Sequence, residues 1–259
     1  MKKALLSVFV FLVFASLGHA TTVLYTQNFE NPDLAAFNAY SGYDGSYNTV
    51  NEIYKDQPYG FTFAQQYTVE TYRVGGNLAW NGAGFVDPQG IAGNYVVGML
   101  SDANPDLLGL SFNVGLYQFL NFKLDISSMD LNFWGGPFVP SGGMAPKFRI
   151  SLYDNPSGAV GLTGNGVLLA YSDITGVISP APNIFNWTNH IVALDATGNT
   201  NGNVTLLIDL LEGGYAAMDN FQIAASDIQG DVGPQVPEPA SLVMMGIIFS
   251  IFAFLYCKK

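Results

Sequence analysis

The sequence predicts an all-β protein, a β-sandwich of jelly-roll type, with an N-terminal signal helix and a C-terminal transmembrane helix. Short runs in which apolar and polar residues alternate recur along the chain, and Gly, Asn, Asp and Pro separate them. Between the two ends, no long stretch repeats with the 3.6-residue period of a helix. Short strands joined by frequent turns are typical of a sandwich.

The clearest strand is KFRISLYD, residues 147–154, in which Phe148, Ile150 and Leu152 share one face. Further strands are expected at residues 23–29, 95–100, 107–114, 203–211 and 216–224. In the run at 203–211 the apolar residues occupy both faces, because Leu207 interrupts the alternation. This pattern predicts a strand that is buried on both sides.

Residues 1–20 are predicted to be a cleaved signal peptide. Lys2 and Lys3 precede a short apolar stretch, and small residues lead up to a cut after Ala20. The alternative is a retained N-terminal anchor. In either case the rest of the chain is expected to be exported.

The C-terminal end predicts a membrane span. Residues 240–257 form an uncharged run of 18 residues. As a helix this run is about 27 Å long, close to the roughly 30 Å of a bilayer core. Lys258 and Lys259 follow it and are expected to stay in the cytoplasm, where they stop transfer. A buried core helix is the alternative, but it would carry a polar face.

Val236, Pro237, Glu238 and Pro239 stand directly before this span. Each proline disfavours helix in the residue before it, so the motif is expected to be extended and exposed. This motif, the span and the short basic end together resemble the PEP-CTERM sorting signal. The resemblance implies export across the inner membrane, a transient membrane anchor, and processing near the motif by exosortase, a membrane-embedded cysteine protease. It further implies release to the cell surface or the extracellular exopolysaccharide matrix.

These boundaries predict a β-sandwich domain at residues 21–225, a linker at 226–235 and the sorting signal at 236–259. Residues 122–135, FKLDISSMDLNFWG, resemble a segment common in exported domains with this tail, in which a strand leads into a Ser-x-Asp-Leu turn. The resemblance supports a sandwich and implies no activity.

The exported region is strongly acidic. Between the signal peptide and the span there are five basic and twenty acidic residues, a formal charge of −15. This balance argues against nucleic acid and anionic lipid as partners, and it suits divalent cations or a neutral polysaccharide. The alternative is that the charge serves solubility alone. The only cysteine is Cys257, inside the predicted span, so thiolate zinc sites and disulfides are excluded from the exported region.

Glu30 and Asp219 are candidate ligands of a structural calcium ion. Many jelly-roll carbohydrate-binding domains hold calcium between their first and last strands, and the early Phe-Glu and late Asp-Asn of this chain resemble that arrangement. The alternative is that both acids only form turns. Residues 195–203, DATGNTNGN, lack the acid spacing of a calcium loop, and a hairpin with Asn201 and Gly202 at its turn is expected there.

A tyrosine-rich stretch offers a candidate sugar-binding surface. Residues 40–72 contain seven of the fourteen tyrosines, and Tyr40, Tyr43, Tyr47 and Tyr54 are the proposed contacts. Aromatic rings can stack on the apolar face of a sugar, but tyrosine also favours strands and covers sandwich faces. The stretch therefore has a structural alternative.

The chain is expected not to be an enzyme. His190 is the only histidine beyond the signal peptide, and no nucleophile-elbow motif accompanies it. The main hypothesis is an exosortase-processed surface or matrix protein associated with exopolysaccharide. One alternative is a carbohydrate-binding module, and a second is a glycoside hydrolase, which would need two facing acids in a cleft.

Overall fold

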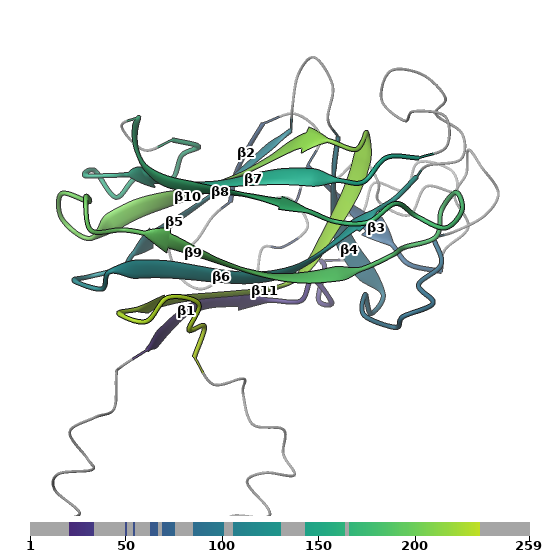
Figure 1. Ribbon diagram of the computed structural model, residues 1–259, viewed down its shortest axis with the longest axis horizontal. Coiled ribbons are helices and arrows are strands. Elements are labelled where there is room, and N and C mark those ends of the chain that lie inside the picture. The colour runs from purple at the N-terminus through teal and green to yellow at the C-terminus, as the bar shows by residue number, and fades with distance from the viewer. Residues whose placement is uncertain are drawn as a thin grey trace, which may run out of the picture.

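The computed structural model describes residues 21–33, 50, 54, 63–66, 69–75, 85–100, 106–130, 143–163 and 166–233. Within these ranges every named element is a strand, and the strands form two antiparallel sheets packed face to face (Figure 1). The prediction of an all-β sandwich is confirmed. The predicted signal and transmembrane helices lie outside the described residues, among which no helix is long and apolar enough to cross a membrane.

Each sheet mixes strands from distant parts of the sequence. Sheet A has the order β3 (Glu70–Arg73), β4 (Tyr95–Leu100), β11 (Tyr215–Ser226), β6 (Phe119–Ser128) and β9 (Thr188–Asp195), and β1 (Thr22–Gln27) also pairs with β11. Sheet B has the order β2 (Ala64–Gln66), β5 (Leu107–Asn113), β10 (Asn203–Glu212), β7 (Lys147–Asp154) and β8 (Val167–Thr175). Because β4 to β7 and β8 to β11 alternate between the sheets, their connections gather at the ends of the sandwich.

Apolar side chains fill the space between the sheets. Phe148, Ile150 and Leu152 of β7 are fully buried, as their alternation predicts. Phe221 is a centre of the aromatic packing, since its ring meets those of Phe29 and Phe122 edge-on at centroid distances of 5.1 and 4.9 Å. Such edge-to-face contacts add to the free energy gained by burying the rings.

Strand β10 is covered on both faces, in agreement with its pattern. Leu207 points away from the core between the sheets but is only 7% exposed. The β7–β8 loop covers this outer face, and it approaches so closely that a Cβ added to Gly109 would lie 2.5 Å from the carbonyl oxygen of Gly161. Asn155 holds the loop in place by donating from its Nδ2 to the carbonyl of Ala159 and to the hydroxyl of Thr205.

The expected hairpin at Asn201 and Gly202 is wrong. The loop that contains these residues joins β9 of sheet A to β10 of sheet B, and the two strands do not pair. Gly202 has a φ of +88°, so the chain does turn sharply there. The turn carries the chain from one sheet to the other, and local residue types do not distinguish such a crossing from a hairpin.

The segment after β11 folds back onto sheet A, so the folded domain extends to Gly233, into the range expected to be a linker. Asn121, fully buried on β6, donates to the carbonyls of Ile228 and Asp231 and accepts from the amide of Gly230. The hydroxyl of Thr21 donates to the carboxylate of Asp231. The two ends of the described domain are therefore fastened side by side.

A second apolar cluster covers part of the outer face of sheet A. Its buried members include Tyr72, Phe85, Phe185 and Trp187. The rings of Phe85 and Phe185 stack at a centroid distance of 5.3 Å. This packing fixes the loop between Phe85 and β4 over the middle of the sheet.

Candidate functional site

An acidic cluster lies where β11 changes partner. Residues 215–218 of β11 pair with β4 and residues 221–225 pair with β1, so Asp219 and Asn220 lie at the junction. A β-bulge at this point gives Asn220 a φ of +54°. On the other side of β11, Asp219 lies directly opposite Asp125 of β6. We call Glu30, Asp125, Asp219 and Asn220 the bulge cluster.

Glu30 fastens the end of β1 to the start of β4. Its carboxylate accepts hydrogen bonds from the backbone amides of Asn94 and Tyr95 at 2.7 and 3.1 Å, and from the Asn94 side chain at 2.9 Å. The approach leaves no room at Gly93, where a Cβ would lie 2.4 Å from the carboxyl group. The backbone of Phe29 has a φ of +55°, an uncommon conformation for a large side chain.

Asp219 is a buried carboxyl with one unsatisfied oxygen. The residue is 1% exposed, its Oδ1 accepts from the amide of Asn220 at 2.6 Å, and its Oδ2 has no hydrogen-bond partner. The pKa of Asp219 is raised to about 8, chiefly by burial. The Asn220 amide opposes this rise, and the nearby carboxylates of Glu30, Asp125 and Asp87 contribute to it.

Amide groups surround the facing carboxylate of Asp125. Asn189 donates to its Oδ1 at 2.8 Å, and Asn220 donates to its Oδ2 at 3.0 Å. The same Asn220 side chain also donates to the carbonyl of Ile91, in the loop that covers the cluster. Carboxylate, amide and carbonyl oxygens are the ligand types that calcium prefers, and the unpaired Oδ2 of Asp219 is available to a cation.

The sequence thus predicted two acids of one cluster, and the structure brings both to the same junction. The Glu30 carboxylate, however, accepts hydrogen bonds from amides of β4. Asp125, which the sequence pattern did not indicate as a ligand, lies directly opposite Asp219. Within the described ranges, no three His, Asp or Glu side chains are arranged as a metal site. The fit to calcium therefore rests on the chemistry of the oxygens and on the unpaired Oδ2 of Asp219.

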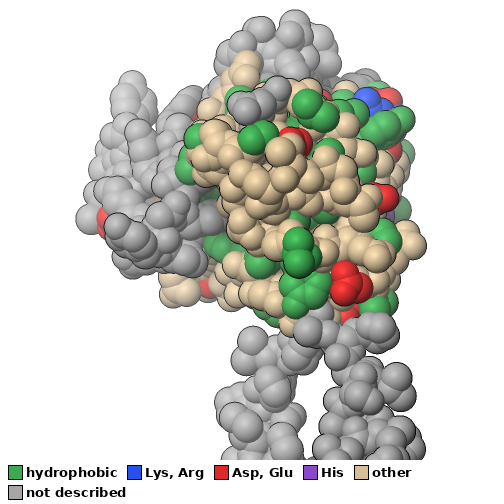
Figure 2. Space-filling view, turned by 90° about the vertical axis from the view of Figure 1, so that its left-hand side faces the viewer, with side chains coloured by type: hydrophobic (Ala, Val, Ile, Leu, Met, Phe, Trp, Pro, Cys, Tyr) green, Lys and Arg blue, Asp and Glu red, His purple; other side chains and the backbone are tan. Residues whose placement is uncertain are grey.

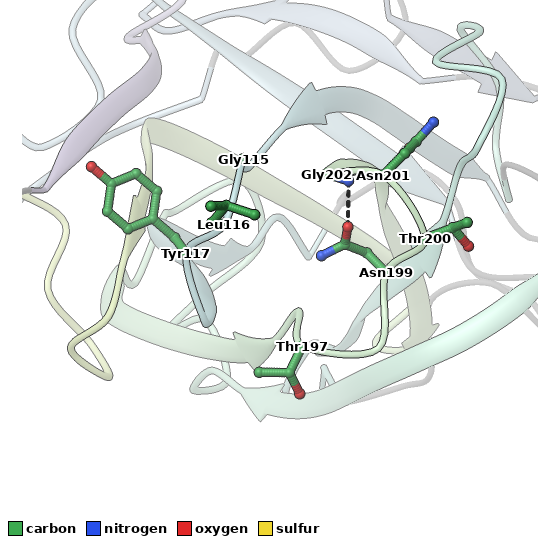
Figure 3. A pocket seen from close by; sticks show the side chains of 8 residues that line it. All are labelled: Gly115, Leu116, Tyr117, Thr197, Asn199, Thr200, Asn201 and Gly202. Atoms are coloured by element: carbon green, nitrogen blue, oxygen red, sulfur yellow. Dashed lines mark hydrogen bonds between the residues drawn. The ribbon is translucent and has the colours of Figure 1, made fainter.

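A polar groove opens at one end of the sandwich, where the β5–β6 turn meets the β9–β10 loop. It has a volume of about 420 Å³. Its lining consists of Gly115, Leu116, Tyr117, Thr197, Asn199, Thr200, Asn201 and Gly202, which we call the loop-end groove (Figure 3). Leu116 is fully exposed at the tip of its turn, and Tyr117 is half-buried beside it. The groove thus joins an apolar contact to a rim of hydroxyls and amides without a formal charge.

The groove loops are held by their own side chains. Asn199 accepts from the amide of Gly202 through its Oδ1, as the dashed line in Figure 3 shows. Its Nδ2 donates to the carbonyl of Ala196 at 2.6 Å. On the opposite wall, the hydroxyl of Tyr117 lies 3.1 Å from that of Thr22, at the start of β1. These bonds give the groove a defined shape before any ligand arrives.

The tyrosines predicted as sugar contacts do not form a described surface. Tyr54 is 3% exposed, packs edge-on against Phe29, and donates its hydroxyl to the Phe29 carbonyl at 2.5 Å. Its ring belongs to the core and cannot stack on a sugar. Tyr40, Tyr43 and Tyr47 lie outside the described residues.

The sorting residues Val236, Pro237, Glu238 and Pro239 and the closing Lys258 and Lys259 also lie outside the described residues. His190 lies on β9, at the edge of sheet A, with its Nε2 3.1 Å from the hydroxyl of Thr188. Its partial burial lowers its pKa, although Asp125 opposes this effect. In the described part of the chain no serine accompanies it in a catalytic arrangement.

Comparison with known proteins adds little beyond the architecture. No family model and no curated protein matches the sequence. Among solved structures, the joined CBM22 and GH10 modules of Clostridium thermocellum xylanase 10B, complexed with xylohexaose, share 11% identity over 79% of this chain and 28% of that chain, with a TM-score of 0.40. A cyclase from Fischerella sp. TAU shares 17% identity over 81% of this chain and 100% of that chain, with a TM-score of 0.43. A carbohydrate-binding module complexed with β-1,4-galactotriose shares 11% identity over 64% of this chain and 88% of that chain, with a TM-score of 0.34. At such values the likeness concerns the fold alone.

Proposed function

We propose that this chain is an exported, non-enzymatic surface protein that binds polysaccharide through the loop-end groove. The observation that carries the proposal is the exposed Leu116 beside Tyr117, set among uncharged hydroxyl and amide groups. A sugar ring has an apolar face and a rim of hydroxyls, and binding sites for such ligands combine apolar contact with a few placed polar groups. The loop-end groove has both features.

The proposal includes the sorting route that the tail implies. The protein would be anchored by its C-terminal span, processed near Pro237–Pro239 by an exosortase, and released toward the surface or the exopolysaccharide matrix. In this route both expected cleavage sites lie outside the segment that the contact of Thr21 with Asp231 closes. The intact mass of the protein from its native host tests it, since a mass that runs to Lys259 contradicts processing.

The facing acid pair of the bulge cluster is not placed for the hydrolysis of a sugar chain. Asp125 and Asp219 face each other across β6 and β11, but they are 7% and 1% exposed. A glycosidase needs its two carboxyl groups on either side of a bound glycosidic bond. Because both carboxyl groups are buried, a sugar chain does not reach this pair.

We further propose that the bulge cluster binds a structural calcium ion. Asp219 and Asp125 would supply carboxylate oxygens, with Glu30 adding negative charge from the end of β1. Such an ion would neutralise the buried acids and tie the strands around β11 together. The dependence of thermal stability on calcium tests this proposal.

Electrophoresis of the detergent-solubilised full-length chain through native gels that contain a polysaccharide tests the binding proposal. The probes are a soluble β-glucan, a galactomannan and a polygalacturonate. We expect at least one polymer to retard the protein. Tyr117→Ala and Leu116→Ser should each weaken that retardation roughly tenfold, which corresponds to about 1.4 kcal/mol of binding free energy.

Matched controls separate a groove effect from a general one. Tyr171→Ala and Leu168→Ser remove an exposed tyrosine and an exposed leucine from β8, outside the groove, and should leave the retardation unchanged. Tyr117→Phe keeps the ring and should keep most of the binding. The proposal fails if no polymer retards the protein, or if the β8 variants lose as much affinity as the groove variants.

A further inference from the structure

Three aspartates accept hydrogen bonds from the loops around the loop-end groove, and their charge affects which polysaccharides the groove can bind. Asp195, at the end of β9, accepts from the backbone amide of Thr197 at 2.8 Å. Asp154, at the end of β7, accepts from the amide of Thr200 at 2.9 Å. Asp227, just after β11, accepts from the amide of Gln118 at 3.1 Å. Three acids from three different strand ends therefore stand behind the groove walls.

Two of these acids also orient hydroxyls of the groove. The Thr197 hydroxyl donates to Asp195 at 2.7 Å, and the Thr200 hydroxyl donates to Asp154. A hydroxyl has a single hydrogen to donate, so the free positions on both oxygens are acceptors. The groove wall thus offers acceptors to the hydroxyl groups of a neutral sugar. A uronate or sulfate group, which only accepts hydrogen bonds, finds no partner in these two side chains.

The carboxylates add an electrostatic barrier to acidic sugars. Asp195 and Asp227 are exposed, and the hydrogen bonds from Thr197 lower the pKa of Asp195, which keeps it ionised at neutral pH. At separations comparable to the Debye length of about 8 Å, their charges still act on a ligand in the groove. Figure 2, which faces this end of the sandwich, shows basic side chains only at the margin of the view.

The basic residues of the described chain are placed too far away to offset this charge. Lys147 and Arg149 lie at the start of β7, about 17–23 Å from Asp154 at its end, given roughly 3.3 Å per strand residue. Both lie within 4.0 Å of the carboxylate of Asp173. Lys123 is four residues along β6 from the groove end, or about 13 Å. Arg73 belongs to β3, at the far edge of sheet A.

We propose that the loop-end groove selects neutral polysaccharide and rejects uronic or sulfated chains, with Asp195 and Asp227 as the residues that discriminate. This inference rests on the proposed function, because it assigns a ligand class to the same groove. It concerns charge and hydrogen-bond polarity and leaves the identity of the sugar open.

The test compares the same three polymers in native gels at low and at physiological salt, with the full-length chain. We expect the β-glucan or the galactomannan to retard the native protein, and polygalacturonate not to do so. Asp195→Asn and Asp227→Asn replace a carboxylate by an amide of the same shape. Each should raise the affinity for polygalacturonate relative to the neutral polymer roughly threefold, as expected for one unit charge at the groove rim, and salt should reduce that gain.

Glu212→Gln provides the control, since it removes an exposed acid at the end of β10 that lies away from the groove, and it should change neither affinity. If polygalacturonate retards the native protein and Tyr117→Ala abolishes that retardation, the groove binds polysaccharide but does not select neutral chains. Equal affinities of the native protein and the double Asp195→Asn, Asp227→Asn variant for polygalacturonate would overturn the role of the two acids. Absence of retardation by every polymer would overturn the proposed function itself.

Discussion

The bulge cluster and the loop-end groove are both built on aspartates at strand ends or irregularities, yet they treat the carboxyl group in opposite ways. At the groove, Asp195 is exposed and accepts two hydrogen bonds from Thr197, which lower its pKa. In the cluster, Asp219 is buried beside other acids with its Oδ2 unpaired, and its pKa rises to about 8. Because the residue type is the same, the difference in pKa comes from the hydrogen-bond donors and the solvent around each carboxyl group.

This contrast assigns different consequences to the two sites. Charge in the bulge cluster is unfavourable in the folded state, so its protonation or neutralisation by a cation should change stability. Charge at the groove is already solvated and hydrogen-bonded, so it should change ligand selection and leave stability nearly constant. The dependence of stability on pH, on calcium and on the groove acids tests that division.

The largest expected effect is a loss of stability as pH rises in the presence of a chelator. Asp219 and Glu70, a second buried acid on β3, each have a pKa raised to about 8. Their unfolded values lie near 4, so the folded state binds more protons between about pH 4 and pH 8. Stability is then greatest below the unfolded pKa and falls as pH rises through the folded pKa.

We expect the free energy of unfolding to decrease by roughly 3–4 kcal/mol per acid between pH 5 and pH 8.5, because most of a pKa shift from about 4 to about 8 is titrated in this range. Urea unfolding of the full-length chain at several pH values measures it. Asp219→Asn and Glu70→Gln should each flatten about half of the slope. A stability that is constant or increases over this range would contradict the burial of the two charges.

The second effect is stabilisation by calcium. An ion at one hundred times its dissociation constant adds about 2.7 kcal/mol, which corresponds to roughly 5–10 °C in Tm for a domain of this size. Thermal unfolding at pH 8 with calcium and with chelator measures the difference. Asp219→Asn should abolish the increase, whereas Asp195→Asn at the groove should preserve it. An identical Tm in both buffers would exclude a structural calcium ion in the bulge cluster.

Sequence reasoning succeeded where the answer depended on local pattern. The buried face of β7 follows directly from side-chain periodicity, and so does the burial of both faces of β10, where Leu207 lies on the outer face. Glu30 and Asp219 were paired through a resemblance, and both do lie at the junction of β1, β4 and β11. The role of Asp125 was not visible, because its register opposite Asp219 is fixed only when β6 pairs with β11.

The groove could not be predicted for the same reason. Leu116 and Asn199 belong to loops about eighty residues apart in the sequence, and they meet because the chain alternates between the sheets. The Gly115-Leu116-Tyr117 turn did contain one indication of a binding surface, because surface turns are usually polar and this one has a leucine after its glycine. Tyr54, by contrast, shows that an aromatic-rich stretch can supply the core and not a surface.

The smallest expected effect is that of groove neutralisation on stability. Asp195 and Asp227 are exposed, and an asparagine at either position keeps an oxygen that can accept the same backbone amide. Substitution by asparagine should therefore change the free energy of unfolding by less than about 0.5 kcal/mol and leave the pH slope intact. Urea unfolding at pH 7 measures the change, with Asp219→Asn as the comparison. If Asp195→Asn altered stability or the pH slope as much as Asp219→Asn, the groove acids would be structural residues. Their charge would then reflect the folding of the loops, and the selection of a neutral ligand would need another cause.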